Sequence, residues 1–383
     1  MRLKNILIII FLCIIFFLPI YFRPDTYPVN GMDSYFFLNY IFGITDNIDG
    51  TPILSQVAMD IMPANLFAIK TIMLLIVIIS ILLLSLASEN IKPGYAVLVA
   101  LILLGNLFFN KLLIRFEDDI FAFPFIALSM YFITLYMHKK QDIKYIYIAL
   151  ASWVISCLFW KFSVYLIFIY AIWTLSYVLF IPAFFLLIFY FSQIISGALG
   201  NFAVAENSPI IGILILFLPF MIFLFSKKTN PLYNKIIAPL CLSLALILLN
   251  VKFALLFYPF FAIYWVATIE KQPIELKIIN IINYCVILLI FCMATYQNIT
   301  AVPNSQYIEL IDVAKSYKTL MPDKEINVSW GFGYLYIWNT KEPYPVFGHI
   351  QPTIENGIII RSIQEPNRCP VMYKNKVGTV EIC

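Results

Sequence analysis

Long apolar runs follow one another from the N-terminus of this chain to about residue 296, separated by short polar segments. The runs are roughly 16 to 22 residues long, close to the ~20 residues that a helix needs to cross ~30 Å of hydrocarbon. A backbone in lipid must satisfy its own hydrogen bonds, so helices are the structure that such runs favour. We predict about eleven membrane spans, near residues 5–22, 66–87, 95–110, 119–137, 145–160, 162–179, 181–196, 209–226, 236–250, 253–269 and 278–296.

The composition agrees with this class. Hydrophobic residues fill 62% of the 383 positions and charged residues only 12%, which is far from the composition of a soluble domain. We predict an all-α polytopic membrane bundle over residues 1–297, followed by a small external α+β domain over residues 298–383. The formal charge of +4 comes mostly from loop residues, so it does not indicate nucleic-acid binding.

Basic residues predict the orientation, because short cytoplasmic loops are enriched in Lys and Arg. With three short crossings between residues 145 and 196, two of them separated at Pro182, all the basic clusters fall on one side. The N-terminus is then cytoplasmic and the C-terminal domain external, in a multi-pass protein of the cell membrane. The cytoplasmic basic residues include Arg2, Lys4, Lys92, Lys139, Lys140, Lys144, Lys271 and Lys277.

The C-terminal segment differs in character from the rest of the chain. Its stretch YIELIDVAKSYKTL has apolar residues at helical spacing, which predicts a helix. Its stretches NVSWGFGYLYIW and KVGTVEIC have the aromatic and β-branched content of short strands. Cys369 and Cys383 form a disulfide if they lie close together in an oxidising compartment, and the sequence leaves that open.

Acidic residues occur in three loops that the orientation places outside: Asp33 in GMDSYFF, Glu117 to Asp119 in RFEDDIF, and Glu206 in VAENSP. Each has an ordinary explanation. Asp33 suits a helix N-cap, the acidic triplet suits the positive end of a helix, and Glu206 suits a solvated loop. Alternatively, carboxylate oxygens from these loops bind a divalent cation such as Mg²⁺ or Mn²⁺.

One basic residue stands at the external end of an apolar run, Lys252 in NVKFALLFYP. Its ordinary explanation is a long side chain that reaches the interface. The alternative is a point charge that holds a phosphate.

Taken in order, these segments resemble the catalytic subunit of oligosaccharyltransferase, of the prokaryotic type, and the wider GT-C superfamily of membrane glycosyltransferases. DSYFFLNY is similar to the DxY segment of that family's first external loop, and Glu117 and Asp119 are similar to its next acidic pair. AVAENSP, with Glu206, is similar to an SVSE or TIXE loop, although Ala203 replaces the leading Ser or Thr. Lys252 occupies the place of a phosphate-binding Arg, but Lys lacks the bidentate fork of Arg.

The external domain departs from the family at its WWDYG motif. Here the chain reads VSWGFGYLYIW, in which Trp330 and Tyr334 resemble the frame of the motif, while the second Trp and the Asp are absent. Recognition of an Asn-X-Ser/Thr acceptor is therefore not expected from these residues. We expect Trp330 and Tyr334 to pack the external domain onto the membrane portion, on the acceptor side.

The resemblance implies transfer of a sugar or oligosaccharide from a polyprenyl phosphate or pyrophosphate (dolichyl-type) donor to an acceptor on the external face. Mn²⁺ or Mg²⁺ is the implied cofactor, and the acceptor is a protein, a lipid or a polysaccharide. Two alternatives remain: a transporter or flippase of a lipid or small solute, and a non-catalytic GT-C relative. The resemblance implies roles for Asp33, Glu117, Asp119 and Glu206 in catalysis and metal binding, and for Lys252 and Arg115 in binding the donor phosphate.

Overall fold

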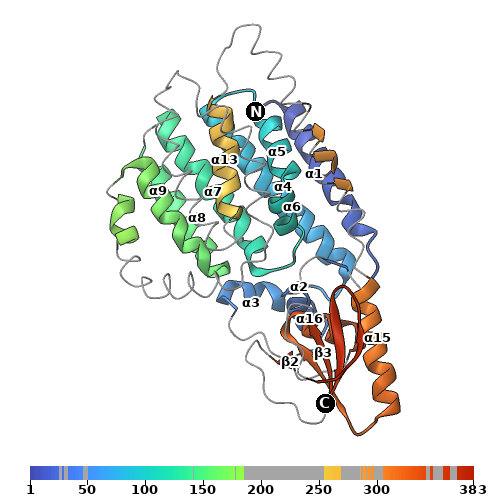
Figure 1. Ribbon diagram of the computed structural model, residues 1–383. Helices are drawn as coiled ribbons and strands as arrows, with labels where there is room; N and C mark the ends of the chain where they lie inside the picture. Colours follow the sequence, from blue (N-terminus) through green and yellow to red (C-terminus); the bar gives the residue numbers. More distant parts are fainter. Residues whose placement is uncertain are drawn as a thin grey trace. The chain divides into compact units, whose positions relative to one another are not determined.

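The structure is a computed structural model and is mostly helical (Figure 1). The chain divides into two compact units. Unit 1 comprises Met1–Phe17, Leu74–Leu113 and Asp118–Thr295, and unit 2 comprises Leu18–Met73, Ile114–Glu117 and Tyr296–Cys383. The structure describes residues 1–25, 28–29, 33–45, 51–140, 142–176, 178–184, 254–268, 285, 288–289, 291–293, 295–296, 305–341, 346–347, 357–362 and 369–383.

Three helices in the described residues are long and apolar enough to cross a membrane: Leu3–Tyr21 (α1), Leu66–Ile91 (α4) and Asp118–His138, which starts as α7 (Asp118–Leu135) and ends in the π-helical turn Tyr136–Lys140. Shorter apolar helices are Ala96–Gly105 (α5), Lys144–Phe159 (α8) and Ser163–Thr174, which includes α9 (Leu166–Thr174). These helices and α13 (Ala254–Thr268) coincide with predicted spans. The spans predicted at 209–226 and 236–250 lie outside the described residues, as does most of 181–196.

Aromatic side chains pack three helices of unit 1 together. Asn106 accepts a hydrogen bond from the backbone of Phe109 at 3.0 Å and so caps the short helix Leu107–Leu113 (α6). The Phe109 ring lies 5.4 Å from Phe123 of α7 and 5.9 Å from Tyr258 of α13, measured between centroids. Such tilted ring contacts stabilise beyond the area that they bury.

Polar side chains also join the helices of unit 1, as is usual where lipid offers no competing partner. The hydroxyls of Ser129 in α7 and Tyr170 in α9 lie 2.5 Å apart. Asn90 of α4 donates to the Thr134 hydroxyl of α7 at 3.1 Å. These bonds fix the neighbouring helices in register.

Our prediction of a helix break at Pro182 is wrong, because the break lies earlier in the chain. The chain leaves α9 at Leu175, which adopts a left-handed backbone with φ of 52°. Residues 178–184 are helical again and contain Pro182. The local cause is the C-terminal cap of α9, where Leu175 adopts the left-handed backbone. Gly or Asn usually marks such a cap in a sequence, and a leucine in an apolar run does not.

The C-terminal part of unit 2 is an α+β module, as predicted. Helix α15 (Ser305–Leu320) precedes a five-stranded sheet of order β2-β1-β3-β5-β4, within the residues described. Strand β1 pairs in parallel with β2 and β3, while β5 pairs antiparallel with β3 and β4. The strands are Glu325–Ser329 (β1), Val346–Phe347 (β2), Gly357–Ser362 (β3), Val371–Lys374 (β4) and Gly378–Ile382 (β5).

The strand prediction for NVSWGFGYLYIW is correct only for its first residues. Strand β1 ends at Ser329, and the aromatic stretch that follows forms helix α16 (Trp330–Thr340). A short, uniformly apolar run does not distinguish a buried helix from a buried strand. Here Tyr336 packs into the sheet core with Ile326 of β1 and Ile360 of β3.

The opposite sheet face buries an ion pair. Arg361 Nε of β3 lies 3.2 Å from Glu381 Oε1 of β5, and both side chains are almost fully buried. Glu381 also accepts hydrogen bonds from the Thr379 hydroxyl and the Cys369 backbone N–H. Beside them, a disulfide joins Cys369 to Cys383, which answers the question that the sequence left open.

We predict that Glu381→Ala destabilises the sheet by about 3 kcal/mol, because it leaves the Arg361 guanidinium buried beside an empty acceptor position. Hydrogen exchange of β3 and β5 in the full-length protein measures this loss. Glu325→Ala, at an exposed position of β1, is the matched control and should leave exchange unchanged. Equal exchange in wild type and Glu381→Ala would contradict the prediction.

Candidate functional site

The segment with the DxY resemblance starts a short helix in unit 2. Helix α2 (Asp33–Ile41) begins at Asp33, where the sequence predicted a helix start. Ser34 and Tyr35 follow and are fully buried. The Tyr35 hydroxyl donates to the Val29 carbonyl at 3.1 Å, which ties the preceding loop to the helix.

The first two predicted loops meet at Ser34. The backbone N–H of Phe116 donates to the Ser34 hydroxyl at 3.0 Å, across 82 positions of sequence, and the bond is buried. This contact holds the segment Ile114–Glu117 against the start of α2 within unit 2. Residues from DSYFF and RFEDD therefore lie side by side.

Glu117, at the end of that segment, is buried with 1% of its side chain exposed. Arg115 Nη1 lies 3.8 Å from Glu117 Oε1, and the Arg115 side chain remains 30% exposed. A buried carboxylate needs compensation by charge or hydrogen bonds. Arg115 provides part of that charge from a position that solvent still reaches.

The next two acidic residues begin α7 in unit 1. Asp119 is fully buried, whereas Asp118 is half-buried. Asp118 Oδ1 accepts the backbone N–H of Asp119 at 3.0 Å, in the first turn of the helix. The positive helix N-terminus favours both charges. Of the acidic triplet, Glu117 and Asp119 are thus the buried members.

Helix α16 packs on α2 in unit 2. Asn39 Nδ2 donates to the Tyr334 carbonyl at 2.9 Å, and the Tyr334 ring lies 5.0 Å from Phe36. Trp330 is the first residue of α16. Tyr334 therefore packs the C-terminal module against helix α2 of the first loop.

Trp338 makes three further contacts that the sequence analysis missed. Its indole Nε1–H donates to the Asp25 carbonyl at 2.7 Å, and its ring meets Phe42 edge-on at 5.1 Å. The Lys341 ammonium lies 3.6 Å from the Trp338 ring centre, and partial desolvation lowers the pKa of Lys341. A Trp in an aromatic run gives no sign of such a role.

A basic pair was also missed. Lys70, within α4, is buried and donates to the Arg23 carbonyl at 3.4 Å, and the Arg23 side chain is buried too. Tyr21 and Thr71 are hydrogen-bonded beside them at 3.1 Å. The signal was present in the sequence, because an ionisable residue within an apolar span is uncommon.

Two predicted site residues, Glu206 and Lys252, lie outside the described residues. Among the residues that the structure does describe, no three His, Cys, Asp or Glu side chains are grouped so that they could hold a metal ion. The four-carboxylate metal site therefore stays a prediction.

Searches of known proteins returned no matching family model and no matching curated protein. The similarity to the GT-C superfamily stays a resemblance of short motifs.

We predict that Ser34→Ala weakens the attachment of Ile114–Glu117 to α2. The variant leaves the Phe116 N–H buried without its acceptor, which costs about 1–3 kcal/mol. The thermal midpoint of the detergent-purified protein should fall by several degrees. Ser316→Ala, which removes an exposed hydroxyl in α15, is the control and should leave the midpoint in place. Equal midpoints for Ser34→Ala and wild type would refute the role of this bond.

Proposed function

We propose that this protein is a membrane glycosyltransferase that transfers a sugar or oligosaccharide from a polyprenyl phosphate or pyrophosphate donor to an acceptor on the external face. The observation that carries the proposal is the meeting of three motif segments in unit 2. Phe116 bonds to Ser34, and Tyr334 bonds to Asn39, so that RFEDD and WGFGY both contact the helix that DSYFF begins. These segments are up to about three hundred positions apart in sequence.

The second support is the burial of acidic residues at these segments. Glu117 and Asp119 are nearly or fully buried, and a buried carboxylate is costly unless it has a function or strong compensation. Oxygen ligands of this type suit Mg²⁺ or Mn²⁺. Glu117 and Asp119, with Asp33 and Glu206 as the expected further ligands, would hold such a cation, which offsets negative charge on the leaving phosphate.

Side chains of the protein would remove the acceptor proton and bind the donor phosphate. A carboxylate of this group orients the acceptor hydroxyl or amide and removes its proton as the new glycosidic bond forms. Arg115, which is partly exposed beside Glu117, and Lys252 are the residues proposed to bind the donor phosphate and stabilise its growing charge. Productive geometry requires the acceptor atom near ~3 Å from the anomeric carbon, in line with the leaving oxygen.

The disulfide supports the external placement of the C-terminal module. Cys369 and Cys383 are bonded, and such bonds persist in oxidising compartments rather than in the cytosol. The distribution of Lys and Arg points the same way. Both observations support the external position that we propose for the site.

One observation favours the transporter alternative, namely Lys70 within the apolar helix α4. Transporters place ionisable residues near mid-membrane. Lys70, however, is the fifth residue of α4 and bonds to the Arg23 carbonyl beyond the end of α1. Its position at a helix end fits an anion-binding or anchoring residue better than a transport pathway.

The proposed function is tested by incubating the detergent-purified protein with radiolabelled polyprenyl phosphate and pyrophosphate sugars, with Mn²⁺ or with a chelator. We predict cation-dependent release or transfer of sugar. Glu117→Gln keeps the shape of the side chain and removes its charge, and it should lower turnover by about 100-fold or more, the effect of losing one group that stabilises a transition state.

Glu325→Gln, at an exposed strand position, is the matched control and should retain wild-type turnover. Two results would reject the transferase proposal: no turnover across the donor panel by protein with an intact thermal transition, or equal turnover by wild type and Glu117→Gln.

A further inference from the structure

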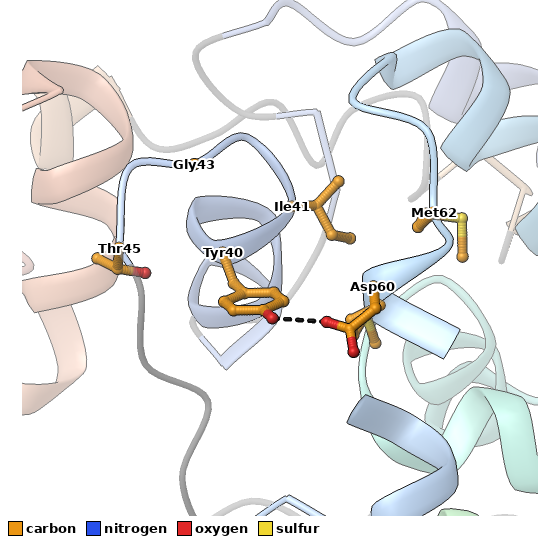
Figure 2. A pocket seen from close by; sticks show the side chains of 7 residues that line it. Tyr40, Ile41, Gly43, Thr45, Asp60 and Met62 are labelled. Atoms are coloured by element: carbon orange, nitrogen blue, oxygen red, sulfur yellow. Dashed lines mark hydrogen bonds between the residues drawn. The ribbon is translucent and has the colours of Figure 1, made fainter. Parts of the chain in front are cut away.

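Unit 2 contains an open pocket of about 360 Å³ between the C-terminal ends of α2 and of helix α3 (Ile53–Asp60) (Figure 2). The Tyr40 hydroxyl donates to Asp60 Oδ1 at 2.6 Å across this pocket. Asp60 is exposed, whereas Met59 is buried. The pocket thus offers both polar and apolar side chains. Its lining comprises Tyr40, Ile41, Gly43, Thr45, Met59, Asp60 and Met62.

One wall of the pocket is held by a well-formed helix terminus. Gly43, with φ of +65°, donates its N–H to the Tyr40 carbonyl, and Ile44 donates to the Asn39 carbonyl. These two bonds make a Schellman motif with glycine at the left-handed position. The backbone from Tyr40 to Thr45 is therefore fixed before any ligand arrives, which lowers the cost of binding.

The polar groups at the pocket can form hydrogen bonds with the hydroxyl groups of a ligand. Asp60 offers a carboxylate, an acceptor that forms strong charge-assisted bonds, and Tyr40 offers a phenol that donates or accepts. The Thr45 hydroxyl is buried and has no hydrogen-bond partner among the described residues. An oxygen in that position gains a full hydrogen bond when a ligand hydroxyl reaches it.

The rest of the lining selects against charged ligands. Ile41, Met59 and Met62 supply apolar surface, and the described lining holds no Lys, Arg or His. A phosphate would meet the Asp60 charge without a compensating cation. A ligand with several hydroxyls and an apolar C–H face matches both parts of the lining.

We propose that this pocket binds an uncharged sugar unit, with Asp60, Tyr40 and Thr45 bonding to its hydroxyls and Met59 and Met62 contacting its C–H face. The proposal deepens the glycosyltransferase function and rests on it for the source of the sugar, while the binding itself does not require turnover. Tyr40 lies seven residues beyond Asp33 along α2, about 10 Å at the helical rise. The bound unit is therefore removed from the bond that reacts.

Binding is measured by saturation-transfer-difference NMR on the full-length protein in detergent. The probes are the methyl pyranosides of glucose, galactose, mannose and N-acetylglucosamine. At least one of these should show transfer to its ring protons. Asp60→Ala and Thr45→Val should each weaken that binding by about tenfold or more, as loss of a hydrogen bond to the ligand implies.

Asp312→Ala, at an exposed position of α15, is the control and should bind as wild type does. The thermal midpoint shows that each variant is folded. The proposal is overturned if none of the four glycosides binds, or if folded Asp60→Ala and Thr45→Val both bind as tightly as wild type.

KM measurements for the donor and for the acceptor show which of the two substrates carries the bound sugar unit. If the unit belongs to the donor, Asp60→Ala raises the KM for the lipid-linked sugar and leaves the KM for the acceptor unchanged; if it belongs to the acceptor, the reverse holds. Unchanged KM values for both substrates, in an active enzyme, would overturn the role of the pocket in transfer. Glycoside binding by a protein without transferase activity would reject the proposed function and retain the sugar site.

Discussion

The short helix α2 holds unit 2 together, because three side chains of this nine-residue helix form hydrogen bonds with three separate parts of the chain. Ser34 accepts from Phe116, Asn39 donates to the Tyr334 carbonyl, and Tyr40 donates to Asp60. A helix of this length is not stable alone in water. It forms because these partners and the aromatic contacts with α16 surround it, so the loops and the C-terminal module depend on the same contacts.

The positions of the charged residues Glu117 and Arg115 depend on the hydrogen bond at Ser34. The bond at Ser34 fixes Ile114–Glu117, and Glu117 is then buried with the partly exposed Arg115 beside it. Burying a carboxylate against apolar helices opposes folding unless charge or hydrogen bonds offset the lost hydration. The proposed site, which would bind a cation and a phosphate, is one reason to keep acidic and basic side chains together in this segment.

Much of the architecture could be predicted because a backbone in hydrocarbon must satisfy its own hydrogen bonds, so long apolar runs form helices. The apolar runs at α1, α4 and α7 are helices, and the apolar spacing of α15 gave a helix in the C-terminal module. The helix start at Asp33 was visible from an acidic residue ahead of an apolar run. The break at Leu175 and the helical form of Trp330–Thr340 were not visible, because tertiary packing decides both.

The candidate site was predictable only as a set of separate loops. Sequence order placed DSYFF, RFEDD and WGFGY along the chain, but the bonds that join them run through Ser34, Asn39 and two backbone groups, which carry no recognisable motif. The same holds for the pocket, since the pairing of Tyr40 with Asp60 arises from two helix ends that meet in space.

The central claim is that buried carboxylates of these loops bind a divalent cation. Electron paramagnetic resonance of Mn²⁺ titrated into the detergent-purified protein tests it directly, since bound Mn²⁺ loses the sharp signal of the free ion. We expect saturable Mn²⁺ binding that Glu117→Gln abolishes and Glu325→Gln preserves. Mn²⁺ that stays free throughout the titration, or that binds Glu117→Gln and wild type equally, would contradict it.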